Sequence, residues 1–258
     1  MSDRVVGILQ ARVGSSRLPG KVLMPACGRP LIARMIDRVR RANRLADLWL
    51  ATSVNPENDA LVEEARRLGV PVHRGSEDDV LARFAGAAAQ ARGDVLVRLT
   101  GDCPLHDPAV IDEAVGLYAE GGADYVSNAL EPTFPDGLDV EVFSREALDR
   151  ADREATTTVQ REHVTPFIHR HHDPDPARPF RVRHFRAPAD FSHLRWTVDE
   201  PADYDFVCRV FEALLPSQPD FGWLDVVALL TREPSLLGQN AGFQRNERYF
   251  EALRAQGR

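Results

Sequence analysis

Cysteine is scarce in this chain of 258 residues, and its few copies lie far apart. Cys27, Cys103 and Cys208 are odd in number, and none belongs to a C-x-x-C spacing. A disulfide framework needs paired cysteines and a zinc site needs closely spaced ligands, so the sequence excludes both. The pattern is typical of reduced thiols in a cytoplasmic protein.

Positive charge and long apolar runs are also lacking. The chain has 32 Lys and Arg against 39 Asp and Glu, a formal net charge of −7. Without a global basic field, we expect no nucleic acid partner. No run of 18 apolar residues occurs, and the N-terminus shows no apolar segment of secretory length, so we expect a cytoplasmic protein with no membrane partner.

The two commonest nucleotide-binding signatures are absent as well. The phosphate loop G-x-x-x-x-G-K-[ST] fails because Val22 follows Lys21, and no G-x-G-x-x-G is present. A different loop follows the apolar run Val5–Leu9, however. It combines three cations with small or turn-forming residues: Arg12, Arg17, Lys21, Gly14, Ser15, Ser16, Pro19 and Gly20. Small residues let backbone N–H groups approach an anion, and the cations neutralise it, so the loop predicts a phosphate site.

The first half of the chain alternates short apolar runs with segments of helical spacing. We expect strands at 5–9, 48–52, 70–73 and 95–99, and helices at 31–42, 58–68, 78–91 and 108–118. This alternation predicts an α/β fold with a doubly wound, mainly parallel sheet and helices on both faces.

After Gly122 the pattern is less regular and predicts a small, partly antiparallel insertion. We expect strands at 125–127, 139–143, 180–185 and 194–197, a turn at 173–179, and helices at 156–172, 202–215, 221–230 and 240–258. No repeat or linker divides the chain. We therefore predict a single domain, with a nucleotide-binding half at about 1–122 and an acceptor-binding and dimerisation half at about 123–258.

Polar residues follow several of the predicted parallel strands, where ligands of such sheets bind. Thr52, Arg74, Ser76 and Gly101 should therefore lie on the same edge as the basic loop. Asp102 follows the strand at 95–99 and is either a Mg²⁺ ligand or a turn residue. Asp199 and Glu200 follow the strand at 194–197, and either of them could instead cap a helix that begins at Pro201.

A second acidic group surrounds Gly137. Asp139 and Glu141 point to one face of a strand, with Asp136 close by, and could bind sugar hydroxyls or amines, join the metal site or form a solvent-facing hairpin edge. Asn128 is a further candidate for substrate contact. His163 is either a hydrogen-bonding or proton-transfer residue or a structural histidine.

The basic loop resembles the opening signature of the sugar cytidylyltransferases, Ala-Arg-x-x-Ser-x-Arg-Leu-Pro-x-Lys. The matching residues are Ala11, Arg12, Ser15, Arg17, Leu18, Pro19 and Lys21. These enzymes activate sugar acids such as Kdo and sialic acid, and the resemblance is greatest to their SpsF-type, spore-coat polysaccharide branch. Further family-like segments are found at 73–79, 101–104, 135–141, 160–166 and 197–204, with a family-like tail at 239–246. Glu200 departs from the family, which often has Thr at that position.

The resemblance implies a Rossmann-like, GT-A-like nucleotidyltransferase that transfers CMP from CTP to a sugar or sugar acid and releases pyrophosphate, for surface polysaccharide or glycoconjugate synthesis. It implies catalytic roles for Arg12, Arg17 and Lys21, and Mg²⁺ or Mn²⁺ on Asp102 and Asp199. Implied nucleotide contacts are Gln10, Ala11, Gly14, Ser15, Thr52, Arg74, Ser76 and Gly101. Implied acceptor contacts are Asn128, Asp136, Asp139, Glu141 and His163. A homodimer is also implied.

Two alternatives remain open on the sequence. The same scaffold can use another triphosphate, such as GTP or UTP, because base choice rests on few residues. The chain could also be a catalytically silent nucleotide-binding scaffold protein. The presence of both the loop cations and the metal-type acids disfavours that reading. The acidic group around Gly137 would suit an acceptor with amino groups or many hydroxyls.

Overall fold

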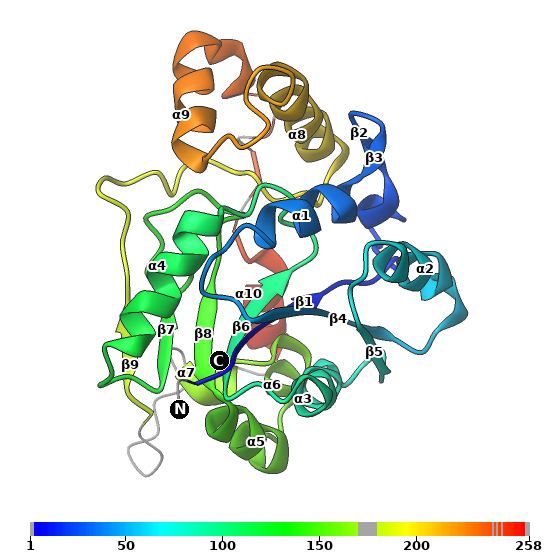
Figure 1. Cartoon of the computed structure of the whole chain (residues 1–258), viewed down its shortest axis with the longest axis vertical. Helices are drawn as coiled ribbons and strands as arrows, with labels where there is room; N and C mark the ends of the chain where they lie inside the picture. Colours follow the sequence, from blue (N-terminus) through cyan, green and yellow to red (C-terminus); the bar gives the residue numbers. More distant parts are fainter. Residues whose placement is uncertain (1–2, 170–179, 239, 241, 244, 256–258) are drawn as a thin grey trace.

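A mixed sheet of seven strands forms the centre of the protein. The computed structural model describes residues 3–169, 180–238, 240, 242–243 and 245–255. The strands, in sheet order, are β5 (Val72–Gly75), β4 (Asp47–Ser53), β1 (Val5–Gln10), β6 (Val95–Thr100), β8 (Glu141–Ser144), β7 (Tyr125–Ser127) and β9 (Val182–His184) (Figure 1). Strand β8 runs antiparallel to β6 and β7, and the other pairings in the sheet are parallel. The predicted mainly parallel sheet with an antiparallel part is confirmed.

Helices cover both faces of the sheet, as the alternation of strands and helices predicts. On one face, the core contains side chains of α1 (Leu31–Val39), α2 (Asp59–Arg67) and α4 (Pro108–Ala119). On the other face, it contains side chains of α3 (Val80–Ala91) and α5 (Arg145–Glu154). Successive side chains of β1 point to opposite faces of the sheet: Leu9 packs in the first of these two groups and Ile8 in the second.

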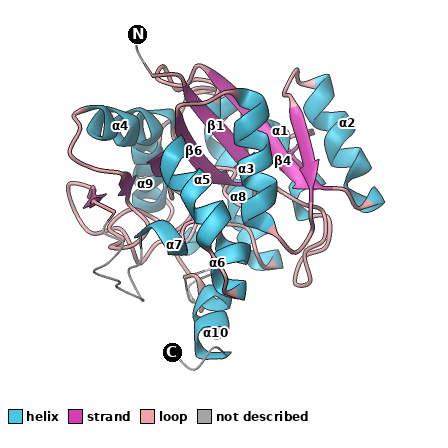
Figure 2. Cartoon of the chain, turned by 90° about the horizontal axis from the view of Figure 1, so that it is seen from below, coloured by secondary structure: helices cyan, strands magenta, loops and turns pink. Residues whose placement is uncertain are grey.

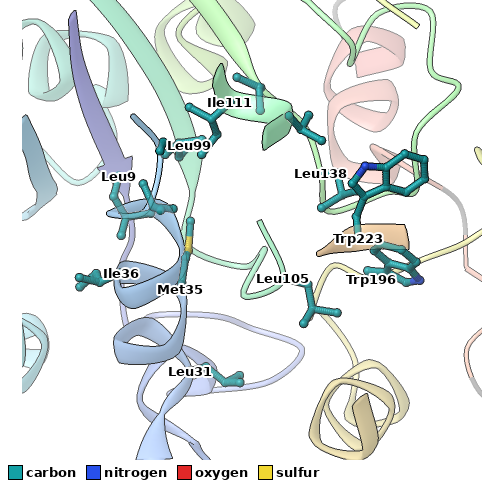
Figure 3. Close-up of a cluster of buried hydrophobic side chains, with 14 of the residues drawn as sticks. Leu9, Leu31, Met35, Ile36, Leu99, Leu105, Ile111, Leu138, Trp196 and Trp223 are labelled. Atoms are coloured by element: carbon teal, nitrogen blue, oxygen red, sulfur yellow. The ribbon is translucent and has the colours of Figure 1, made fainter. Parts of the chain in front are cut away.

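The larger core continues from the sheet into the C-terminal part of the chain. Trp196 and Trp223 are buried beside Leu138 in the cluster that also contains Leu9 and Met35 (Figure 3). The helices α8 (Pro201–Leu214) and α9 (Trp223–Arg232) contribute to this cluster and cap one end of the molecule (Figure 1). The nucleotide-binding and acceptor-binding halves predicted from the sequence therefore share one continuous core.

The second half departs from the prediction at three places. The helix expected at 156–172 is broken into α6 (Thr158–His163) and α7 (Pro166–His169). Val164 adopts a positive φ of 70° between them, and Pro166 has no N–H to continue a helix. The segment 194–197 is not a regular strand and pairs through a single bridge between Asp136 and Arg195. Helix α5 was not predicted.

The remaining elements are short or lie near the C-terminus. They are β2 (Pro25–Ala26), β3 (Arg29–Pro30), three 3-10 turns, η1 (Lys21–Leu23), η2 (Pro56–Asn58) and η3 (Pro234–Leu236), and α10 (Glu247–Ala255). Helix α10 lies within the polar helix expected at 240–258 and begins later, at Glu247. The turn predicted at 173–179 lies outside the described residues. Among the helices that the structure describes, none is long and apolar enough to span a bilayer.

Candidate active site

A cavity of about 340 Å³ opens at the carboxyl ends of β1 and β6. Its lining comes from six stretches of the chain, within residues 10–22, 98–103, 136–141, 162–169, 195–199 and 246–249, with further contacts from Val80, Arg83, Ala129 and Leu130. Because β1, β4, β5 and β6 are parallel, their carboxyl ends share one edge, as the sequence predicts. Of these four strand ends, those of β1 and β6 contribute to the described cavity lining.

A close approach of two backbones brings these strand ends together. The N–H of Gly101 donates a hydrogen bond to the carbonyl of Gln10 at 2.8 Å. A Cβ at position 101 would lie 2.5 Å from the Cβ of Ala11, so only glycine fits there. The turn after β6 therefore packs directly on the basic loop and places Asp102 opposite Lys21.

Lys21 lies between the two acids predicted to hold a metal. Gly20, with a φ of 74°, is the N-cap of η1, and Lys21 is turned inward, where it is 8% exposed. Its Nζ is 2.6 Å from the carbonyl of Val198, 2.8 Å from Asp199 Oδ1 and 3.7 Å from Asp102 Oδ2. The charge of Lys21 is thus shared between carboxylates from two distant parts of the chain.

Asp102 is held in its ionised form. Burial would raise the pKa of its carboxyl, but the positive charge of Lys21 and hydrogen bonds from Thr100 and Cys103 outweigh burial and hold that pKa below its usual value. An ionised carboxylate at this position can bind a cation.

Asp199 is contacted by two more cations. Arg17 lies 3.1 Å from Asp199 and 3.2 Å from Glu200, and Arg195 lies 3.3 Å from Asp199. Glu200 is the N-cap of α8, Pro201 is its first residue, and Asp203 accepts a hydrogen bond from the Glu200 N–H at 3.0 Å. Glu200 therefore caps the helix, whereas Asp199 lines the cavity. The two roles considered for this acidic pair belong to different residues.

Arg12 lines the opposite wall. It forms an ion pair with Glu77, whose carboxylate also accepts a hydrogen bond from Asn55 at 3.2 Å. Gln10, Ala11, Gly14 and Ser15, predicted to contact the nucleotide, line the same part of the cavity.

The acids around Gly137 face the cavity rather than forming a solvent-exposed hairpin edge. Gly137 has a φ of 107°, and a Cβ there would lie 2.6 Å from the backbone N of Thr197, so this turn packs against segment 194–197. Asp136 lies 3.2 Å from Arg195 and 3.8 Å from Arg245, and Asp139 forms an ion pair with Arg245. Burial, together with the charge of Asp139, raises the pKa of Asp136 to about 7.

Glu141 is the most completely bonded of these acids. It pairs with Arg98 and accepts hydrogen bonds from Tyr125 Oη at 2.5 Å and from Thr165 Oγ1 at 2.6 Å. Burial would raise the pKa of Glu141, but Arg98 and these hydroxyls hold it below its usual value. Each of the three acids in this half of the cavity is therefore paired with an arginine.

His163 lines the cavity with an unpaired ring nitrogen. Its Nε2 is buried and has no hydrogen-bond partner among the described residues, and its ring meets that of Tyr249 edge-on at 5.0 Å. Burial, followed by the charge of Arg98, lowers the pKa of His163 to about 4. The imidazole is therefore neutral near pH 7.

Four of the predicted contacts do not line the described cavity. Thr52 is fully buried in β4, and Ser76 accepts a hydrogen bond from the backbone N–H of Asp79 at 3.0 Å. Asn128 bridges the backbone on either side of Asp139, donating to Leu138 and accepting from Val140 at 2.8 Å each.

The fourth is Arg74, which is directed at the loop after β4. Its guanidinium donates to the carbonyls of Ser53, Val54 and Asn55 at 2.9–3.0 Å and pairs with Asp59 at 2.7 Å. Arg74, Ser76 and Asn128 thus hydrogen-bond to neighbouring backbone, whereas the buried hydroxyl of Thr52 has no hydrogen-bond partner among the described residues. The nucleobase and acceptor contacts expected of these four residues stay predictions.

Several cavity residues were missed. They include Arg83, Arg98, Glu162, Thr165, Arg195, Glu247 and Tyr249. Arg98 and Arg195 carried a usable signal, because each is a lone cation within a short apolar run. Burial of such a side chain requires a partner, and both arginines pair with cavity acids. Glu247 and Tyr249 follow the family-like tail at 239–246, which was noted in the sequence without being assigned to the site.

Comparison with known proteins identifies the family. The cytidylyltransferase family matches residues 6–217. MJ1063 of Methanocaldococcus jannaschii is 38% identical, over 78% of this chain and 80% of its own. The spore coat polysaccharide biosynthesis protein SpsF of Bacillus subtilis is 34% identical, over 91% and 96%. A 3-deoxy-manno-octulosonate cytidylyltransferase of Geobacter sulfurreducens is 32% identical, over 46% and 47%.

Solved structures show the same fold. A cytidylyltransferase from Leptospira borgpetersenii superposes with a TM-score of 0.86 at 29% identity, covering 94% of this chain and all of the other. Rv0371C of Mycobacterium tuberculosis, solved as a complex with manganese, superposes with a TM-score of 0.55 at 20% identity, covering 82% and 100%. The chain thus belongs to the cytidylyltransferase family, and it is a nucleotidyltransferase.

Proposed function

We propose that this protein transfers CMP from CTP to a hydroxyl group of a sugar acid. The acceptor oxygen forms a bond to the α-phosphorus, the bond from that phosphorus to the bridging oxygen of the β-phosphate breaks, and pyrophosphate leaves. The proton of the acceptor hydroxyl passes to solvent water. The observation that carries this proposal is the position of Lys21, between Asp102 and Asp199 in a cavity that also contains Arg17.

The basic loop is suited to the triphosphate. Lys21, Arg12 and Arg17 supply the positive charge that a leaving pyrophosphate requires, and the backbone around Gly14 and Ser15 can donate N–H groups to phosphate oxygens. Such a transfer needs alignment and charge neutralisation, with no covalent intermediate on the protein. Gln10, Ala11 and Gly101 remain the proposed contacts to the rest of the nucleotide.

Asp102 and Asp199 are the proposed ligands of Mg²⁺, or of Mn²⁺ in its place. The described residues contain no cluster of three or more His, Cys, Asp or Glu side chains that could hold a metal by themselves. Two carboxylates fit Mg²⁺ nonetheless, because it is commonly bound by one or two carboxylates together with substrate phosphates and water. Held by Asp102 and Asp199, such an ion would supply charge neutralisation and would acidify an acceptor hydroxyl.

The charge pattern of the other half of the cavity favours a sugar acid. Asp136, Asp139 and Glu141 are each paired with an arginine, so the described lining offers none of these carboxylates unpaired to an ammonium group. Paired carboxylates still accept hydrogen bonds from sugar hydroxyls, and the arginines tolerate an acceptor carboxylate. The relative named for 3-deoxy-manno-octulosonate supports the same class, and SpsF supports a role in polysaccharide synthesis.

An acceptor panel tests the proposal. The protein is incubated with CTP, MgCl₂ and 3-deoxy-manno-octulosonate, N-acetylneuraminate, glucose or glucose 1-phosphate, and CMP-linked products are identified by mass spectrometry. We expect a CMP-sugar and an equal amount of pyrophosphate with a sugar acid, and none when UTP, GTP or ATP replaces CTP. Products formed only with the neutral sugar or the sugar phosphate would refute the sugar-acid assignment.

A further inference from the structure

The segment near the C-terminus packs against the acceptor half of the cavity. Helix α10 lies beside α6 in both views of the molecule (Figures 1 and 2). Asn246, Glu247 and Tyr249 line the cavity, and Glu247 lies 3.4 Å from Arg17. The residues of this segment that the structure describes, within 240–249, thus form part of the wall of the active site. We call them the C-terminal wall.

The C-terminal wall is anchored to the charge network of the site. The side chain of Asn240 is buried and donates hydrogen bonds of 2.9 Å to the carbonyl of Arg195 and to Asp203. Phe243 lies against the guanidinium of Arg195, 5.5 Å from ring centre to carbon. These contacts link the wall to the arginine that also binds Asp136 and Asp199.

Arg245 is the residue of the C-terminal wall that brings a positive charge to the acids of the acceptor site. Its guanidinium pairs with Asp139, lies 3.8 Å from Asp136 and donates to the carbonyl of Phe134 at 3.1 Å. The Arg245 side chain is only 14% exposed. Asp136 has Arg195 as a second cation, whereas Arg245 is the cation paired with Asp139 in the described part of the chain.

Loss of Arg245 would leave a carboxylate in the acceptor site without its counter-ion. An unpaired, desolvated carboxylate is unfavourable, so Asp139 would then either take up a proton or bind another cation. An ammonium group on the acceptor is the cation that could replace the guanidinium. Arg245 thus already pairs with the carboxylate to which an ammonium group of an acceptor could otherwise bind.

We propose that the C-terminal wall completes the acceptor site and that Arg245 is a positioning residue that selects hydroxylated over aminated sugar acids. This inference rests on the proposed transfer to a sugar acid and adds the source of its selectivity. Arg245 acts through Asp139 and Asp136, so its removal changes recognition of the acceptor and leaves recognition of CTP unchanged.

The test compares matched acceptor pairs in four forms of the full-length protein. The pairs are 3-deoxy-manno-octulosonate with its 8-amino-8-deoxy analogue, and N-acetylneuraminate with its 9-amino-9-deoxy analogue. The forms are wild type, Arg245→Met, Arg245→Lys and Arg254→Met. Arg254 is an exposed arginine of α10 that donates to the carbonyl of Phe250, so its variant removes the same charge from the same helix region.

We expect Arg245→Met to raise the KM for the hydroxylated sugar acid and to raise the ratio of kcat/KM for the aminated over the hydroxylated acceptor, each by about tenfold or more. Arg245→Lys restores the wild-type ratio because it restores the charge, and Arg254→Met matches wild type. The KM for CTP stays within about twofold in all forms, since the triphosphate end is untouched.

Two results would overturn the inference on its own. One is that wild type is active and that Arg245→Met has the same ratio of kcat/KM for the aminated over the hydroxylated acceptor as wild type. The other is an equal loss with both acceptors and with CTP, which indicates a purely structural role for Arg245. A wild-type protein that binds CTP but converts no sugar acid would overturn the proposed function, and this inference with it.

Discussion

Replacing Lys21 by methionine isolates the contribution of one ammonium group. Methionine is unbranched and of similar length, so the change removes the charge and leaves the aliphatic packing nearly intact. The variant loses the hydrogen bond to the carbonyl of Val198 at 2.6 Å and the contacts to Asp199 and Asp102 at 2.8 and 3.7 Å. Because Lys21 is 8% exposed, water replaces these contacts poorly.

The expected loss of activity is much larger than the loss of stability. A donor aimed at developing charge in an enclosed site contributes about 3–4 kcal/mol to the transition state, so kcat should fall by about 10²–10³. Asp199 keeps Arg17 and Arg195 within 3.3 Å, which limits the loss of unfolding free energy to about 1–3 kcal/mol.

Initial rates of pyrophosphate release, at saturating CTP and sugar acid, measure the first quantity, and thermal unfolding measures the second. Arg40→Met is the matched control. Arg40 donates to the carbonyls of Leu68 and Gly69, away from the described cavity lining, so its loss should leave kcat unchanged. A folded Lys21→Met protein that retains more than about a tenth of wild-type kcat would refute the role given to Lys21.

Three further perturbations test other parts of the site. Gly101→Ala should destabilise the protein by about 1–3 kcal/mol in urea unfolding and reduce turnover, since its Cβ would lie 2.5 Å from the Cβ of Ala11. His163 in the folded protein has a pKa of about 4 and is neutral near pH 7. As pH falls from 6.5 to 4, the unfolding free energy of wild type should therefore fall by up to about 3 kcal/mol relative to that of His163→Gln. Curves of unfolding free energy against pH that run parallel for the two proteins would contradict this. EDTA should abolish pyrophosphate release. Added Mg²⁺ or Mn²⁺ should restore this release in wild type but not in Asp102→Asn. Release that does not depend on metal would contradict the proposed ligands.

Local patterns were sufficient to predict the first half of the fold. Apolar runs such as 5–9 and 95–99 became β1 and β6, because buried parallel strands need continuous apolar sequence. Prediction failed where long-range contacts prevail over local preference. Val164 is held at a positive φ that breaks the expected helix, and segment 194–197 is held by contacts with the turn at Gly137 instead of a regular strand ladder.

The sequence by itself determined the residue types of the site. Lys21, Arg17, Asp102 and Asp199 were identifiable as cations and acids next to strand ends, and all four line the cavity. Arg17, Lys21 and Asp102 follow apolar runs that form β1 and β6, so the order of elements along the chain indicates their place at the sheet edge, whereas Asp199 follows a segment that tertiary contacts hold in place.

Only the tertiary structure decided how those charges are paired. Asp139 is matched with Arg245 across 106 positions, and Lys21 with Asp199 across 178. The order of residues in the sequence does not indicate which cation pairs with which acid. The cost of burying each charge is offset by the partner that the fold places next to it. From the sequence, the acids around Gly137 therefore suggested contacts to hydroxyl or amino groups of an acceptor, and the folded chain pairs each of them with an arginine.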